Sequence, residues 1–200
     1  MRRFAFRPAL TLRGRKFKGL RGFAGKPFHP PLTDVPIGAY TVVAGTDVLS
    51  KVLHSGHPVV AMQLYKAGTF TMWGGAVVSL FTALTGFWDW WRSSEAGTQA
   101  RRTVNAHAWT MITATVLVVV DLVLRTWQYD ANPAVPGRVL LISLVIFVLI
   151  VIGGTIGGEL TYDYGFNVET AGDSPVWAKS EGDVMPDGST RRGPTPVQPA

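Results

Sequence analysis

Residues 139–158 read VLLISLVIFVLIVIGGTIGG and contain no charged side chain over twenty consecutive positions. About 20 mostly apolar residues in a helix suffice to cross the hydrocarbon core of a bilayer. Residues 67–88 are also uncharged, and so are residues 103–120 if His107 is neutral. Only 16% of all residues are charged, which fits this segregation. The sequence therefore predicts an integral membrane protein with at least three helical spans.

The fourth candidate span, residues 35–53, is less apolar because Asp47 interrupts it. Charge distribution decides its assignment. Residues 1–33 contain nine Lys and Arg and no acid, and a second basic stretch, RSSEAGTQARR, occupies residues 92–102. Four spans place both stretches on the cytoplasmic side, as the positive-inside rule requires, whereas three spans place them on opposite sides. We therefore predict four spans, at about 35–53, 67–89, 104–126 and 138–158.

The expected architecture is an all-α integral membrane protein, a four-helix transmembrane up-and-down bundle of the bacterial inner (plasma) membrane with both termini cytoplasmic. Residues 29–168 form the membrane domain. Residues 1–28 interleave basic and apolar side chains, which predicts a partly disordered arm on anionic lipid rather than a nucleic-acid-binding segment. Residues 169–200 are acidic and rich in Pro and Gly, which predicts a disordered cytoplasmic tail.

The residue types present exclude several kinds of chemistry. The chain has no cysteine, so disulfides, thiolate metal sites and thiol nucleophiles are absent. No serine, histidine and acid set can be placed together, and no phosphate-binding loop is recognisable. The sequence therefore favours a protein that is not an enzyme.

The segment HPPLTDVPIG, residues 29–38, has a structural and a functional interpretation. Structurally, Asp34 is an expected N-cap and Pro36 lies in the first turn, so the segment starts the first span. Functionally, five ionisable side chains are expected near the inner membrane boundary on different elements. They could ligate a metal, hold haem b between the two histidines, or load protons, although no specific motif selects one of these. The alternative is that His107 hydrogen-bonds across the bundle and Asp89 accepts from Trp N–H groups. The five residues are His29, Asp34, Asp89, His107 and Glu159.

A second group of charges is expected nearer the outer face. Asp121 and Arg125 are four residues apart on one helix, in the favourable order, and Asp47 should reach a similar depth. Each charge alone costs about 2.5–3.5 kcal/mol at the bilayer centre on the insertion scale, so mutual neutralisation is expected. Structural linkage is the first interpretation, and a proton or ion path is the alternative.

Small residues recur at four-residue spacing in two spans. Gly153 with Gly157, and Gly154 with Gly158, occur in the last span, while Gly75, Ser79 and Ala83 follow one another in the second. Such spacing lets helix backbones approach closely in lipid. We expect packing within the bundle, with homodimerisation as the alternative.

These segments together resemble a bacterial membrane family catalogued as domain of unknown function 2231. The resemblance covers residues 29 to about 168, in the order HPPLTDVPIGAYT, ALTGFWDW, RRTVNAHAW and GGTIGGELTYDYGFNV. Many relatives have a second histidine where this chain has Asp34. Some relatives carry a Rieske-type or cytochrome-type domain, which implies redox work in the membrane. The residues that match the family pattern are His29, Pro30, Asp34, Pro36, Asp47, Gly86, Asp89, His107, Gly157, Gly158 and Tyr162.

Three functions remain open on the sequence alone. The first is a non-enzymatic accessory or scaffold component that associates with membrane redox proteins. The second is an electron-transfer protein that holds haem b between His29 and His107. The third, and weakest, is a small transporter or proton conductor that uses Asp47, Asp121 and Arg125.

Overall fold

The computed structural model describes residues 28–165, 183–184 and 190–191. Each predicted span lies inside one helix of the structure. The predictions for residues 1–27 and for most of the acidic tail concern residues outside the described part of the chain. The helices are α1 (His29–Leu53), α2 (Pro58–Ser93), α3 (Gln99–Trp127) and α4 (Gly137–Tyr162).

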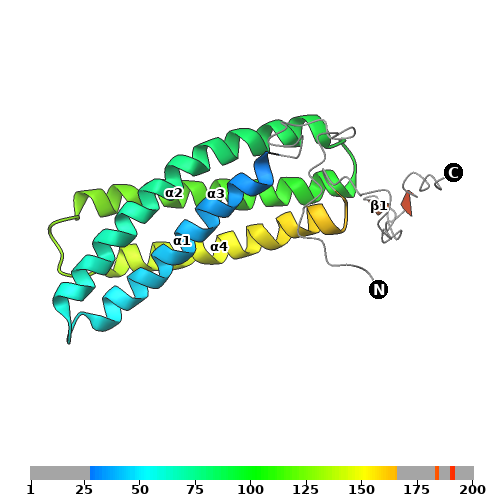
Figure 1. Ribbon diagram of the computed structural model, residues 1–200. Helices are drawn as coiled ribbons and strands as arrows, with labels where there is room; N and C mark the ends of the chain where they lie inside the picture. The colour runs from blue at the N-terminus through cyan, green and yellow to red at the C-terminus, as the bar shows by residue number, and fades with distance from the viewer. Residues whose placement is uncertain (1–27, 166–182, 185–189, 192–200) are drawn as a thin grey trace, which may run out of the picture.

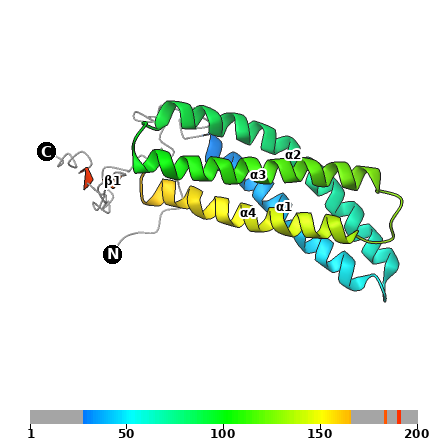
Figure 2. The same cartoon turned by 180° about the vertical axis from the view of Figure 1, so that it is seen from behind.

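The four helices lie side by side and alternate in direction (Figures 1 and 2). Helix α1 packs against α2 and α4, and α3 packs against the same two, so that α1 and α3 occupy diagonal positions. We call the end where α1 begins and α4 ends the terminal end. The loops of residues 54–57 and 128–136 lie at the opposite end.

Helix α1 begins at His29, and this corrects the prediction that Asp34 is its N-cap. Pro30 and Pro31 lie in the first turn, where the backbone N–H groups have no partner within the helix. The two prolines are therefore compatible with helix, and the His-Pro-Pro segment is the first turn itself. Asp34 lies on the exposed surface of α1.

Pro36 is buried inside α1, at a position where proline usually disrupts a helix. Because Pro36 has no N–H, the carbonyl of Leu32 loses its partner four residues along the helix. The hydroxyl of Thr82 in α2 donates to this carbonyl at 3.4 Å, and it also lies 3.0 Å from the carbonyl of Val78 in its own helix. Because this hydroxyl has one proton and shares it between the two carbonyls, helix α2 compensates in part for the missing N–H of Pro36.

The central apolar core draws on all four helices. A smaller apolar group, Tyr65, Val135 and Val139, lies toward the opposite end. These two groups hold the helices together in the middle of the molecule and near the opposite end. The members of the central core are Tyr40, Val43, Met72, Ala114, Val118, Leu122, Ile146 and Ile150.

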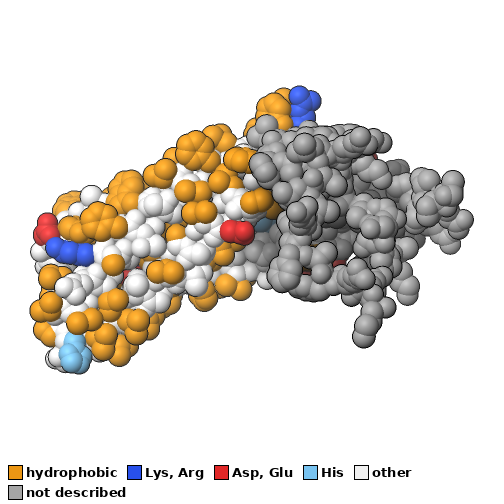
Figure 3. Space-filling model, in the orientation of Figure 1, with side chains coloured by type: hydrophobic (Ala, Val, Ile, Leu, Met, Phe, Trp, Pro, Cys, Tyr) orange, Lys and Arg blue, Asp and Glu red, His pale blue; other side chains and the backbone are white. Residues whose placement is uncertain are grey.

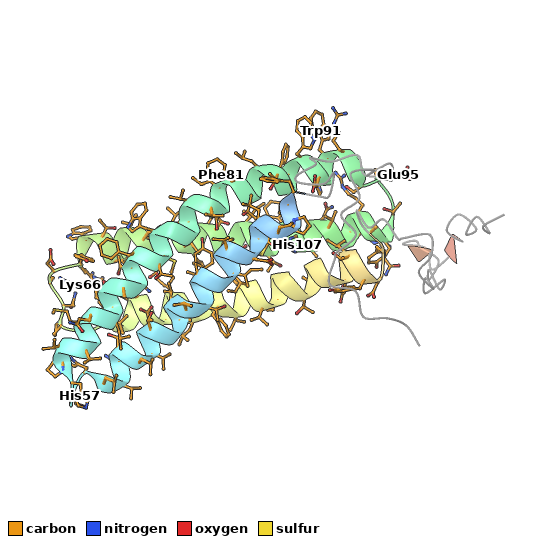
Figure 4. All side chains as sticks on the ribbon, viewed as in Figure 1. His57, Lys66, Phe81, Trp91, Glu95 and His107 are labelled. Carbon is orange, nitrogen blue, oxygen red and sulfur yellow. The ribbon has the colours of Figure 1, made fainter. Side chains whose placement is uncertain are left out.

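Three of the helices, α2, α3 and α4, are long and apolar enough to cross a membrane. Their outward side chains are mainly large and apolar, as the orange surface in Figure 3 shows for the described part of one face. Figure 4 shows Phe81 and Trp91 pointing away from the helices. Helix α1 is not among the three, and it carries Asp34, Asp47 and Lys51 within its 25 residues.

Two short strands, β1 (Asp183–Val184) and β2 (Thr190–Arg191), pair in antiparallel register. They lie within the tail for which the composition predicted disorder. Backbone pairing gives these four residues a regular structure that a composition argument does not foresee.

Candidate functional site

The most buried polar group of the described chain joins α1 to α3 near the opposite end. Asp47, Asp121 and Arg125 each have a side chain that is 0% exposed. Arg125 donates from Nε to Oδ2 of Asp121 at 2.8 Å and from Nη1 to Oδ1 of Asp47 at 3.1 Å. Its Nη2 atom also binds Oδ2 of Asp47. We call these three residues the ion cluster.

The ion cluster links diagonal helices, which make no direct backbone packing with each other among the described residues. The guanidinium of Arg125 extends from α3 across the centre of the molecule to both carboxylate oxygens of Asp47 on α1. Such bidentate contacts fix the relative orientation of the two side chains as well as neutralising their charges. The arrangement suits a structural link, because it determines the relative register of α1 and α3.

Helix α2 closes one side of the ion cluster. A Cβ atom at Gly68 would lie 2.8 Å from Oγ1 of Thr46 and 3.5 Å from Oδ1 of Asp47, so this position has no room for a side chain. The ring of Tyr65 lies 5.7 Å from the guanidinium carbon of Arg125, within the range of a cation–π contact. Neither residue is predictable from the sequence, since the roles of Tyr65 and Gly68 depend on how α2 is aligned with α1.

Ser50 of α1 links α2 and the loop between α3 and α4 at the same end of the molecule. Its hydroxyl donates to the carbonyl of Ala61 in α2 at 2.7 Å, and it accepts from the backbone N–H of Val135 at 3.1 Å. One buried side chain of α1 thus holds both α2 and the loop between α3 and α4. This loop is also attached to α2 at the surface, where Lys66 donates to Asp130 at 2.9 Å.

At the terminal end, His29 lies against α2. Its Nδ1 atom is 3.0 Å from the carbonyl of Thr82 and 3.2 Å from the hydroxyl of Thr85. Since a carbonyl can only accept, Nδ1 carries the proton in this arrangement. A Cβ atom at Gly86 would lie 2.6 Å from Cε1 of His29, so the glycine provides the space for the imidazole.

His107 makes the corresponding contact between α3 and α4. Its Nδ1 atom lies 2.8 Å from the carbonyl of Gly153, which again places the proton on Nδ1. A Cβ atom at Gly157 would lie 3.2 Å from Cε1 of His107. This hydrogen bond between helices is the one that the structural interpretation of His107 predicts. Figure 4 shows His107 among the helices.

The remaining residues of the predicted inner group do not share one environment. Asp89 is buried, whereas Asp34 and Glu159 are exposed. The indole N–H of Trp90 donates to Asn105 at 2.7 Å. Within the described ranges, no three His, Cys, Asp or Glu side chains are grouped closely enough to hold a metal ion.

The four glycines of α4 lie on two different faces of the helix. A Cβ atom at Gly153 would collide with Met111 of α3, and one at Gly157 would press on His107, so these two glycines serve packing within the molecule. A Cβ atom at Gly154 would meet nothing within 4 Å, and one at Gly158 would meet only Tyr162 of the same helix. In α2, Gly75 faces α1 and Ala83 is exposed.

An apolar cleft of about 530 Å³ lies between α2 and α3. Trp73 and Leu80 line it from one side and Val119 from the other. Its polar groups include Tyr40 and Ser79, whose hydroxyls hydrogen-bond to each other at 2.7 Å. No local sequence pattern predicts this cleft, because it results from the loose packing of two helices that are consecutive in the chain.

The family model described as predicted membrane protein DUF2231 matches residues 25–170. The chain belongs to this family. The match includes all four helices, so the DUF2231 assignment applies to the whole helical domain. The family description identifies this domain as a membrane protein. Comparisons with curated proteins and with solved structures found no match.

The residues by which the sequence resembles the DUF2231 family are partly explained by contacts in the structure. Gly86 and Gly157 each make room for one of the imidazoles, His29 and His107 respectively. Asp47 binds Arg125 in the ion cluster. The resemblance therefore rests in part on residues that touch one another although they are distant in the chain.

Proposed function

We propose that this protein crosses the membrane four times, as a four-helix transmembrane bundle with both termini in the cytoplasm, and serves as an accessory or scaffold component beside membrane redox proteins. The contacts of α1 with α2 support the fourth span. Gly68, Gly75 and Gly86 are spread along α2, and they face Thr46, Ala39 and His29 of α1 in turn. A helix that follows a membrane-spanning neighbour over this length lies at the same depth.

The charges of α1 are compatible with lipid in this arrangement. Asp47 is 0% exposed and is neutralised by Arg125, so it does not face hydrocarbon. The outward side chains of the same segment include Val42, Leu49 and Val52, all exposed and apolar. Lys51 lies two residues before Leu53, the last residue of the helix, and its long side chain can extend to the interface. The nine basic residues of the N-terminal arm support a cytoplasmic terminal end.

The ion cluster is the observation that carries the scaffold role. Its three charged side chains bind one another in the interior and hold diagonal helices in one register. Both oxygens of Asp47 and Oδ2 of Asp121 are bound to Arg125, so α1 and α3 cannot shift along one another without breaking these contacts. A rigid bundle with an apolar exterior is suited to support a neighbouring membrane protein. The family resemblance supports redox proteins as that neighbour.

A second candidate, a protein that binds haem b, is favoured by the state of the two histidines. Both His29 and His107 direct Nδ1 to a backbone carbonyl, which leaves Nε2 as the nitrogen with a free lone pair. Ligating histidines in metal proteins usually have this orientation, because the Nδ1 contact fixes the ring. Without cysteine, any haem would be held non-covalently, and it would supply one-electron chemistry.

The visible spectrum of the purified full-length protein separates the two candidates. The scaffold role predicts a colourless protein that nevertheless co-migrates with a haem-staining complex in native gels of mildly solubilised membranes. The haem alternative predicts a Soret band that His107→Ala removes and that His57→Ala, a change in the exposed loop, leaves intact. A Soret band of the isolated chain with this behaviour would replace the scaffold role by electron transfer.

A further inference from the structure

The ion cluster contains one more negative charge than positive charge when all its groups are ionised. Asp47 and Asp121 each contribute one negative charge, and Arg125 contributes one positive charge. Arg125 binds Asp47 with both terminal nitrogens, so this pair is neutral by itself. Asp121 receives only the Nε–H of Arg125. The surplus charge therefore belongs to Asp121, which is 0% exposed.

Two buried polar atoms beside this surplus charge have no hydrogen-bond partner among the described residues. One is Oδ1 of Asp121, and the other is the hydroxyl of Tyr65. Tyr65 is itself 0% exposed and is within electrostatic range of all three charged residues. A buried ionised carboxylate with an unpaired oxygen is unfavourable, because neither water nor a donor offsets its lost hydration.

A proton removes this imbalance better than a metal ion does. Hard cations require several oxygen ligands, whereas the buried side chains of the described residues offer here two oxygens without a hydrogen-bond partner, Oδ1 of Asp121 and the Tyr65 hydroxyl. A bridging water would satisfy the hydrogen-bonding groups but would leave the surplus charge. We propose that the ion cluster binds one exchangeable proton, carried on Oδ1 of Asp121.

The protonated form keeps every contact of the ion cluster. A new O–H bond forms on Oδ1 when hydronium transfers its proton and leaves as water, so that the charge of the cluster changes from minus one to zero. Oδ2 becomes the carbonyl oxygen and still accepts from Nε of Arg125. The groups that face the site are Asp47 from α1, Tyr65 from α2 and Arg125 from α3, with Arg138 of α4 acting on Tyr65.

Infrared spectroscopy of the full-length protein in lipid at pH 7 tests this proposal. Exposed carboxyl groups are ionised at this pH, since their pKa values are about 4. The wild type is expected to show the C=O stretch of one protonated carboxyl group. Asp121→Asn should abolish the band, and Asp34→Asn, which changes an exposed acid on α1, should leave it unchanged. A wild type without the band, or a band that survives Asp121→Asn, would overturn the proposal.

A second variant tests the charge balance that underlies the proposal. Asp47→Asn removes one negative charge, so Asp121 becomes the sole ionic partner of Arg125. The band at pH 7 should then disappear although the Asp121 carboxyl is still present. Persistence of the band in a helical Asp47→Asn protein, verified by circular dichroism, would show that burial alone protonates Asp121 and would contradict the charge-balance argument. Either result is independent of the scaffold role, which the visible spectrum tests.

Discussion

At the residue scale, Arg125 links α1 to α3, two helices that do not pack directly against each other. Asp121 and Arg125 can be paired from the sequence, because acid and base stand four residues apart on one helix. Asp47 can be added because its depth in the first span is similar. Tyr65 and Gly68 cannot be found in this way. Tyr65 is one of many interfacial or core aromatics in sequence terms, and Gly68 has no glycine four residues away.

Arg125→Ala should strongly destabilise the protein. It leaves two carboxyl groups buried without their cation, and breaking a buried pair by removing one partner typically costs about 3–5 kcal/mol. We expect the free energy of unfolding in detergent to fall by about that amount. Lys51→Ala, which removes an exposed lysine at the same end, should change it by no more than about 0.5 kcal/mol. Equal effects of the two variants would contradict the structural role of the ion cluster.

At the scale of elements, the existence and order of the four helices follow from the apolar runs, but the start of α1 does not. The N-cap prediction for Asp34 was wrong because two consecutive prolines fit the first turn of a helix as well as they fit an extended segment. The side of a helix that faces its neighbour was also only partly predictable. Of the small residues singled out in α2, Gly75 contacts α1, whereas Ala83 faces outward.

Close packing of α1 on α2 is testable with two adjacent glycines. A Cβ atom at Gly75 would lie 2.8 Å from Cβ of Ala39 and 2.9 Å from Cε1 of Tyr40, whereas one at Gly74 would meet nothing within 4 Å. Gly75→Ala should therefore lower the thermal stability in detergent, with a cost of about 1–3 kcal/mol for overpacking. Gly74→Ala should be neutral or stabilising by up to about 1 kcal/mol, because alanine favours helix. The opposite order would show that α1 and α2 pack through other faces.

At the scale of the whole molecule, the two ends differ in composition. The two imidazoles contact neighbouring helices toward the terminal end, and the ion cluster joins α1 to α3 toward the opposite end. The sequence predicts this division, since it follows from counting spans and from the depth of each polar residue. The apolar cleft between α2 and α3 and the strand pair of the tail were not predictable, because both depend on contacts that no local pattern records.

The number of membrane crossings is the central claim, and single-cysteine labelling tests it directly because the natural chain has no cysteine. Ser55→Cys should react with a membrane-impermeant thiol reagent added to intact cells. Phe28→Cys, just before α1, and Glu95→Cys, between α2 and α3, should react only after the membrane is permeabilised. If Phe28→Cys instead reacts in intact cells as Ser55→Cys does, α1 does not cross the membrane and the four-span arrangement is wrong.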